Sequence, residues 1–178
     1  MDEAADRCLV FLAQHPNVGI TYDATAPRPE LHAFSDSNWT VGHSTTGWAI
    51  LYGGAVIGYG SKRQQSIALS STEAEIMAAS MAATEILYFR GLLFELGHEL
   101  DPTVLHVDNQ GVVELSRDMK SCQRSRHIER RYLRVRELVA AGDIVVKFIE
   151  TALNPADILT KPLEFPDFER HSRALLGA

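Results

Sequence analysis

The order of the predicted strands and helices constrains the fold of this chain more than any single residue does. The segments that alternate or are rich in β-branched and aromatic residues, and so predict strands, are 31–36, 45–52, 55–61, 103–108 and 143–150. The predicted helices are 71–96, 109–116, 126–142 and a terminal helix opened by "NPADILTK" at 154–161, with a peripheral helical tail at 164–178. Gly53-Gly54 predicts a hairpin between the second and third strands. A hairpin meander leading into helical crossovers predicts an α/β fold: a mixed five-stranded sheet with helices on both faces.

Length and composition predict one domain with a sizeable core, because the chain has 178 residues of which 46% are hydrophobic. Its two cysteines, Cys8 and Cys122, are too few for a disulfide framework, so a reducing intracellular setting is expected. Charged residues or glycines interrupt the apolar runs before 18 residues, which predicts no membrane span. The acidic start lacks the basic region of a signal peptide.

The net charge of −6 hides a strong local asymmetry. Of the 17 Lys and Arg residues, eight lie within twenty positions: Arg117, Lys120, Arg124, Arg126, Arg130, Arg131, Arg134 and Arg136. A solvated helix face and a phosphate-binding surface both explain such a run, and the two interpretations stay open on this feature alone.

Two glutamates, Glu73 and Glu75, open the long predicted helix and point to nearly opposite sides of it. The residues that share a face with Glu75 are uniformly apolar: Ala78, Ala79, Ala82, Ile86, Phe89 and Leu93. Glu73 lies three residues after Ser70, which is the spacing of a capping box. Glu75 therefore lies in line with the buried stripe, where a carboxylate needs a cation or a metal as its partner.

Three aspartates lie where a strand ends or a helix begins. Asp36 and Asp108 each close an apolar strand, whereas Asp157 follows Asn154 and Pro155, a natural N-cap and first helical residue. An aspartate in the position of Asp157 is most often only a helix cap. If the first and fourth strands are adjacent and parallel, Asp36 and Asp108 converge, and four clustered carboxylates then require divalent cations.

Several motifs together carry a resemblance to a known family. The segments "SDSNW", "SKRQQSIALSSTEAEIMAAS", "HVDNQGVVEL", "RSRHIERRYLRVRE" and "NPADILTKPL", in this order, resemble the ribonuclease H domain of copia-type retrotransposon Pol polyproteins. The resemblance implies three parts: a connecting segment from the reverse transcriptase side at 1–30, the ribonuclease H domain at 31–163, and a C-terminal tail at 164–178.

The resemblance implies the strand order 3-2-1-4-5 and a catalytic, metal-binding set of Asp36, Glu75, Asp108 and Asp157. The expected activity is hydrolysis of the RNA strand of RNA–DNA hybrids with two Mg²⁺ ions, for which Mn²⁺ can substitute, leaving 5′-phosphate ends. The implied partners are the hybrid and the reverse transcriptase domain of the same polyprotein. The implied location is intracellular: cytoplasmic, within retrotransposon particles.

Substrate contacts are also implied by the resemblance. Gln110 and Asn109, just past Asp108, match positions that reach the minor groove, where a protein distinguishes RNA by its 2′-hydroxyls. Ser71 and Thr72 match the polar pair beside the catalytic glutamate, although Ser and Thr at a helix start also act as caps. The arginines Arg124, Arg126 and Arg130 are expected to bind backbone phosphates, with a steep dependence on salt.

Two alternatives remain at this level. A transposase or integrase strand-transfer domain shares such acids, but the position of Glu75 as second in chain order disfavours it. The other alternative is a catalytically weak or domesticated domain that binds nucleic acid without cutting it. His127, in "RSRHIERRY", is expected to have a structural role.

Overall fold

The computed structural model of the chain describes residues 3–23, 25, 29–117 and 126–178, except for the side chains of Ala4 and residues 126–132. The strands are β1 (His32–Asn38), β2 (Thr45–Tyr52), β3 (Ala55–Arg63), β4 (Thr103–Val107) and β5 (Ile144–Phe148). The α-helices are α1 (Glu3–Gln14), α2 (Ser71–Glu95), α3 (Gln110–Arg117), α4 (Arg126–Ala141) and α5 (Phe165–Leu176). Two 3-10 helices, η1 (Thr151–Leu153) and η2 (Pro155–Leu159), follow β5.

The five strands form one mixed sheet in the order β3-β2-β1-β4-β5, which confirms the predicted fold class and strand order. β1, β2 and β3 pair antiparallel, with Gly53 and Gly54 at positive φ in the turn between β2 and β3. β1 pairs parallel to β4, and β4 pairs parallel to β5. The carboxyl ends of β1 and β4 therefore lie side by side, as the convergence of Asp36 and Asp108 requires.

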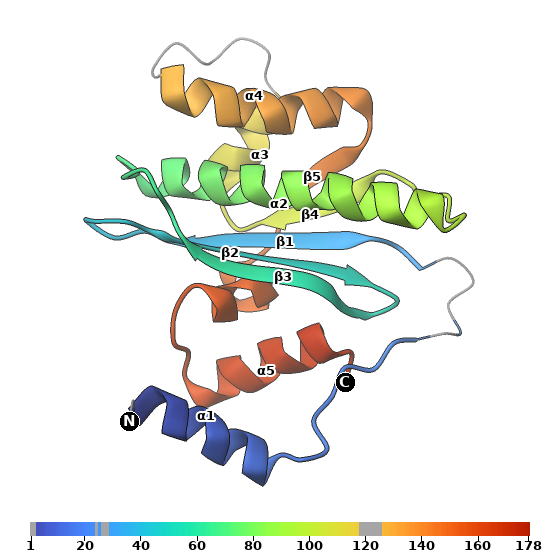
Figure 1. The fold of residues 1–178 in the computed structure, drawn as a ribbon. Coiled ribbons are helices and arrows are strands. Elements are labelled where there is room, and N and C mark those ends of the chain that lie inside the picture. Colours follow the sequence, from blue (N-terminus) through green and yellow to red (C-terminus); the bar gives the residue numbers. More distant parts are fainter. Residues whose placement is uncertain (1–2, 24, 26–28, 118–125) are drawn as a thin grey trace.

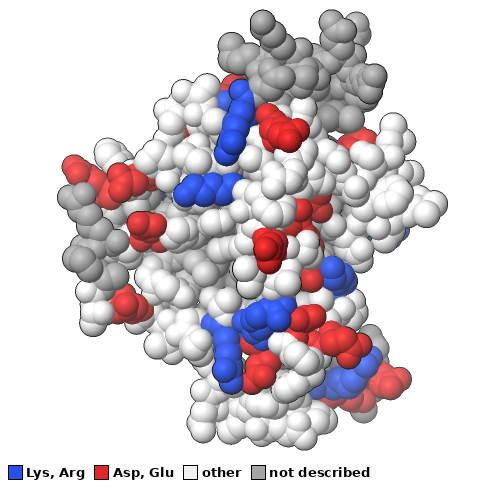
Figure 2. Space-filling view, turned by 180° about the vertical axis from the view of Figure 1, so that it is seen from behind, with Lys and Arg blue, Asp and Glu red and all other residues white. Residues whose placement is uncertain are grey.

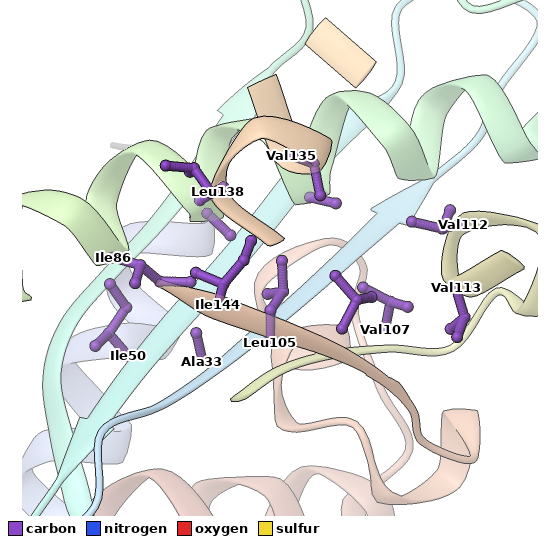
Figure 3. Packing of buried hydrophobic residues seen from close by; sticks show 14 of the residues in the cluster. Ala33, Ile50, Ile86, Leu105, Val107, Val112, Val113, Val135, Leu138 and Ile144 are labelled. Carbon is purple, nitrogen blue, oxygen red and sulfur yellow. The ribbon is translucent and has the colours of Figure 1, made fainter. Parts of the chain in front are cut away.

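Helices lie on both sides of the sheet (Figure 1). α2, α3 and α4 cover one face, and the main core fills the space beneath them (Figure 3). Residues from four strands, including Ala33, Ile50, Leu105 and Ile144, pack there against Ile86 of α2. η2 and α5 lie on the opposite face, where they contact β2 and β3 respectively.

The local signals of α2 act as the sequence predicts. The Ser70 hydroxyl accepts a hydrogen bond from the Glu73 N–H, and the Glu73 carboxylate accepts one from the Leu69 N–H. At the other end Gly97 adopts a positive φ, and His98 N–H donates to the Leu93 carbonyl. The face that begins at Glu75 is buried through Ala78, Ala79, Ala82, Ile86 and Leu93. By length and composition α2 could also cross a membrane, but here it is the core helix of the domain.

The C-terminal region differs from the prediction at 154–161, whereas the helical tail predicted at 164–178 is confirmed as α5. "PADIL" forms the short 3-10 helix η2, and a separate helix, α5, begins at Phe165. α5 contacts η2 and β3, and the Leu176 carbonyl accepts a hydrogen bond from the Thr21 N–H of the segment after α1. The division of the chain at 30 and 163 stays a prediction.

Candidate active site

Three carboxylates converge at the carboxyl ends of β1 and β4. Asp36 lies on β1, Asp108 follows the last residue of β4, and Glu75 lies in the second turn of α2. One ligand atom of each lies within 4.8 Å of the others. We call Asp36, Glu75 and Asp108 the acidic cluster.

The sheet register explains why the two aspartates meet. Ser35 of β1 is opposite Val107 of β4 in a parallel pair, so the next residues, Asp36 on β1 and Asp108 just after β4, lie at the same level of the sheet. Glu75 joins them because its face of α2 packs on β1 and β2. The helical phase of α2 thus brings Glu75 to the cluster, and the pairing of β1 with β4 brings Asp36 and Asp108 to it.

Glu75 is buried, with 6% of its surface exposed, and only one of its carboxylate oxygens has a partner. Oε1 accepts hydrogen bonds from the Ser37 N–H at 3.1 Å and from the Ser37 hydroxyl at 2.8 Å. Oε2 is buried without a hydrogen-bond partner among the described residues. Burial, followed by the charges of Asp36 and Asp108, raises the pKa of Glu75 to about 8.

Asp36 is also buried, and its Oδ2 accepts a hydrogen bond from the Thr160 hydroxyl. Burial is the main cause that raises the pKa of Asp36 to about 6; the charges of Asp108 and Asp157 add to it, while the Thr160 bond opposes it. Asp108 is half-buried, and its Oδ2 accepts a hydrogen bond from the Thr151 hydroxyl at 2.8 Å.

Asp157 lies close enough to raise the pKa of Asp36, but it is not one of the three acids within 4.8 Å of one another. Asn154 holds η2 on the sheet: its side-chain amide donates to the Ser35 carbonyl at 2.9 Å, and its Oδ1 accepts from the Ala156 N–H. Asp157 is buried on η2 and pairs with Lys161, whose Nζ lies 2.6 Å from Oδ1. Burial works against the charge of Lys161, but Asp157 and then Asp36 and Asp108 raise its pKa overall.

Gly47 permits this close approach of η2. It is opposite Asp36 in the β1–β2 register. A Cβ at this position would lie 2.8 Å from the Ala156 carbonyl oxygen and 2.9 Å from the Leu159 Cβ. Only a residue without a side chain allows the backbone carrying Asp157 to pack here.

The acidic cluster fits divalent cations. Its donors are carboxylate oxygens, the ligands that Mg²⁺ and Mn²⁺ prefer. The buried Oε2 of Glu75 has no protein partner among the described residues, and burial together with neighbouring acids raises the pKa values of Glu75 and Asp36. Lys161, the cation whose charge acts on Asp36, is already paired with Asp157.

The predicted substrate contacts lie around one side of the cluster. Asn109 and Thr72 come together at Gly111, where an added Cβ would lie 3.0 Å from Asn109 Oδ1 and 3.4 Å from Thr72 Cγ2. Ser71 and Gln110 are exposed as the first residues of α2 and α3. Asn109 has a structural role too, since its Oδ1 accepts from the Val112 N–H at the start of α3. Their binding roles stay predictions.

Arg124 lies outside the described residues, and the side chains of Arg126, Arg130 and His127 are not described either, although α4 contains the last three. On the face seen in Figure 2, the described Lys and Arg residues are interspersed with Asp and Glu. Arg134 of α4, for example, pairs with Glu137. The phosphate-binding role of this basic segment stays a prediction.

Four side chains that hold the acids carry no distinct signal of their own in the sequence: Ser37, Thr151, Thr160 and Lys161. For two of these residues, Ser37 and Lys161, the only signal in the sequence was a position close to one of the predicted acids. Ser37 directly follows Asp36, and Lys161 lies four residues after Asp157. Thr151 reaches Asp108 across 43 positions, a pairing that sequence spacing does not reveal.

Solved structures that are similar to this chain include ribonucleases H. The chain is similar to RNase H1 from the halophilic archaeon Halobacterium salinarum NRC-1, with a TM-score of 0.55 and 22% identity over 74% of this chain and 94% of that one. It is also similar to LC11-RNase H1 in complex with an RNA/DNA hybrid, with a TM-score of 0.59 and 13% identity over 74% and 94% of the two chains. The fold therefore defines an α/β protein of the ribonuclease H-like class.

Related sequences narrow this class to one family. The chain is 37% identical over 126 residues to the retrovirus-related Pol polyprotein from transposon TNT 1-94 of Nicotiana tabacum, covering 71% of this chain. It is 34% identical over 177 residues, or 97% of its length, to the Pol polyprotein from transposon RE2 of Arabidopsis thaliana. These relatives are copia-type Pol polyproteins, and together with the ribonuclease H-like fold they agree with the resemblance of the chain to the ribonuclease H domain of such a polyprotein. It spans 10% and 12% of these two relatives, and no family model matches it.

Proposed function

We propose that this domain hydrolyses the RNA strand of RNA–DNA hybrids with two bound divalent cations, Mg²⁺ or Mn²⁺, and leaves 5′-phosphate ends. The observation that carries the proposal is the acidic cluster, in which Asp36, Glu75 and Asp108 offer ligand atoms within 4.8 Å of one another. The ribonuclease H-like fold places this cluster where the carboxyl ends of two parallel strands meet. The relatives are retrovirus-related Pol polyproteins from transposons, which supports a role for the domain in reverse transcription.

The residues of the chain hold and orient the ligands in this proposal. Asp36, Glu75 and Asp108 are the central ligands, and Asp157 is a peripheral ligand that separates from Lys161 to take part. When bound, the cations would lower the pKa of a water molecule and neutralise charge on the departing 3′ oxygen. Ser37 and Thr160 fix the carboxylates of Glu75 and Asp36 by hydrogen bonds.

Selection of RNA is assigned to the polar residues beside the cluster. Thr72 and Asn109 lie against Gly111, and Gln110 is exposed next to them. Amide and hydroxyl groups in this position can exchange hydrogen bonds with 2′-hydroxyls in the wide minor groove of an A-like duplex. Gln110→Ala is expected to reduce the preference for hybrid over duplex DNA without unfolding the protein, because its side chain is exposed.

A cleavage assay tests the proposal directly. The full chain is incubated with an RNA–DNA hybrid, duplex RNA and duplex DNA, with Mg²⁺ or with EDTA. We expect metal-dependent cutting of the RNA in the hybrid alone, with 5′-phosphate products. Binding without cutting would instead identify a catalytically weak or domesticated nucleic-acid-binding domain.

The reverse transcriptase domain of the same polyprotein is the proposed protein partner. α1 has 12 residues, a length at which an isolated helix is marginal in water. Phe11 makes an edge contact with Phe168 of α5, but Leu9 and Leu12 are 64% and 62% exposed. We propose that this apolar side of α1 is the surface that contacts the reverse transcriptase domain. Leu9→Glu with Leu12→Glu should then weaken the association of the two domains, as measured by calorimetry.

The proposed location follows from the same relatives. Pol polyproteins of retrotransposons act inside cells, and we assign this domain to cytoplasmic particles in which the element is reverse transcribed. Co-sedimentation of the domain with the element's RNA in cell extracts tests the assignment.

A further inference from the structure

A groove beside the acidic cluster has the chemistry of a phosphate-binding site, and its basic residues lie in the segment "SKRQQSIALSSTEAEIMAAS". It has a volume of about 330 Å³ and lies between the end of β3 and the middle of α2. Its polar lining comes from Lys62, Arg63 and Gln65 on one side and from Ser80, Thr84 and Glu85 on the other. We call it the basic groove.

The sheet register places the basic groove near the acidic cluster. Lys62 is opposite Thr46, and Thr46 is opposite Ser37, the residue that binds Glu75. Adjacent strands are about 4.8 Å apart, so the backbone of Lys62 lies on the order of 10 Å from that of Ser37. A duplex whose backbone lay over the acidic cluster would therefore extend over β3 within one or two nucleotides.

Lys62 and Arg63 are exposed cations without a carboxylate partner among the described residues. This distinguishes them from Arg90, Arg170 and Arg173, each of which is paired with an acid. Glu85 is the one acid in the lining, so two positive charges face one negative charge. Unpaired cations close to the three carboxylates of the acidic cluster are the charges needed to attract a phosphodiester that the acids themselves repel.

The basic pair is held rigidly relative to the catalytic glutamate by the next residue, Gln64. Its side-chain Nε2 donates to the Thr46 hydroxyl at 2.9 Å and to the carbonyl of Ala74, the neighbour of Glu75, at 3.0 Å. Its backbone N–H donates to the Ser44 carbonyl at 2.7 Å. The end of β3 is thus tied both to the loop after β1 and to the first turns of α2, so a phosphate bound there would have a fixed position relative to Glu75.

We propose that the basic groove, through Lys62 and Arg63, binds a backbone phosphate of the nucleic acid and sets the register of the duplex on the acidic cluster. This inference rests on the proposed hybrid substrate and adds a second anchor, separate from the basic segment at 117–136. Gln65 and Ser80 would donate the neutral hydrogen bonds, because both line the groove with polar side chains.

The test compares two double variants that change the net charge equally. Lys62→Gln with Arg63→Gln removes the basic pair. Arg7→Gln with Lys147→Gln is the matched control, since it removes two exposed or half-exposed cations of α1 and β5 that lie outside the groove. Hybrid binding is measured against salt concentration, with both pairs placed in an Asp36→Asn background so that the hybrid is not cut.

Loss of the basic pair should weaken binding at low salt by about tenfold or more and reduce the slope of log K against log[salt] by about two, while the control keeps nearly the full slope. Hybrids that carry one neutral methylphosphonate, in either the RNA or the DNA strand, identify the strand that the basic groove binds. At the contacted phosphate, neutralising the phosphate and removing the basic pair should not have additive effects on binding. Equal slopes for both double variants would overturn the inference. Failure of the proposed function is a separate result, namely that the wild-type chain does not cut hybrid with Mg²⁺.

Discussion

The same kind of side chain behaves differently in two regions of this molecule. On α5, Asp167 and Glu169 are exposed, and each pairs with an arginine one turn along the helix, at 2.6 and 2.9 Å. In the acidic cluster, Glu75 and Asp36 are buried and held by hydroxyl groups, with the nearby Lys161 engaged elsewhere. Both regions contain carboxylates, but among these described residues only the cluster has a buried carboxylate oxygen, Glu75 Oε2, without a hydrogen-bond partner.

The difference separates a stabilising arrangement of acids from one that is suited to binding metal. An exposed pair one turn apart on a helix contributes a few tenths of a kcal/mol and is screened by salt. Buried acids without cations destabilise the metal-free protein, because each must lose its water or take up a proton. The cluster is therefore costly to the fold unless cations bind, and the variants below test this comparison.

The largest expected effect is on catalysis. Asp36→Asn should reduce hybrid cleavage by roughly a hundredfold or more, because it removes a central charged ligand. Asp167→Asn, the matched change on α5, should keep the rate within about twofold. Initial rates with labelled hybrid and Mg²⁺ measure both. A wild-type cleavage rate for Asp36→Asn would contradict the assignment of the acidic cluster as the metal site. The cleavage rate of Asp157→Asn should lie between those of Asp36→Asn and Asp167→Asn.

The next effect concerns stability and pH. The pKa of Glu75 is raised to about 8 and that of Asp36 to about 6, so both groups hold protons more tightly in the folded chain. Their contributions are fully present below the unfolded values, near pH 4, and are lost as pH rises toward 8. In EDTA, the urea midpoint of the protein should therefore fall over that pH range, because the stabilisation from these two groups is lost. Mg²⁺ should raise the midpoint most at pH 8.

Glu75→Gln should flatten this decline, whereas Glu169→Gln on α5 should keep it. Denaturation curves at pH 5 and pH 8, with and without Mg²⁺, measure the difference between the two variants. If the stability of Glu75→Gln fell with pH as steeply as that of the wild type, ionisation of Glu75 would not be what destabilises the metal-free protein.

A smaller effect is expected from the packing that brings Asp157 near the cluster. Gly47→Ala would place a Cβ within 3 Å of η2 and should lower the free energy of unfolding by about 1–3 kcal/mol and also reduce cleavage. Gly91→Ala is the control, because a Cβ there meets nothing within 4 Å, and a helical alanine should stabilise by about 0.5–1 kcal/mol. Equal stability of the two variants would contradict the close approach of η2.

The smallest effects should come from the ion pairs. Lys161→Gln leaves the buried Asp157 without its cation and should cost about 1 kcal/mol, a modest figure because the Lys161 side chain is 40% exposed and screened by solvent. Arg170→Gln on α5 breaks a pair that is exposed on both sides and should cost less than about 0.5 kcal/mol. Thermal unfolding of both variants at 50 mM and 500 mM salt measures the contrast.

Much of the fold followed from local patterns. The bounds of β2, and the starts of β3, α2 and β4, lie where the sequence predicted them, because alternation, caps and glycine turns act over a few residues. The helix predicted to open at Asn154 was wrong in detail, since "PADIL" forms only a short 3-10 helix before Lys161 and Pro162, whereas the helical tail predicted at 164–178 is α5. Pro162 has a fixed φ and no N–H, and it disfavours helical geometry in the residue before it.

The sequence by itself determined which glutamate is buried, since helical phase places Glu75 and not Glu73 on the apolar face of α2. The tertiary structure alone decided what holds the three acids of the cluster: Ser37 on Glu75, Thr151 on Asp108 and Thr160 on Asp36. The physical reason is range. A helix repeats every 3.6 residues and can be recognised locally, whereas contacts such as Thr160 with Asp36, 124 positions apart, exist only once the sheet has paired.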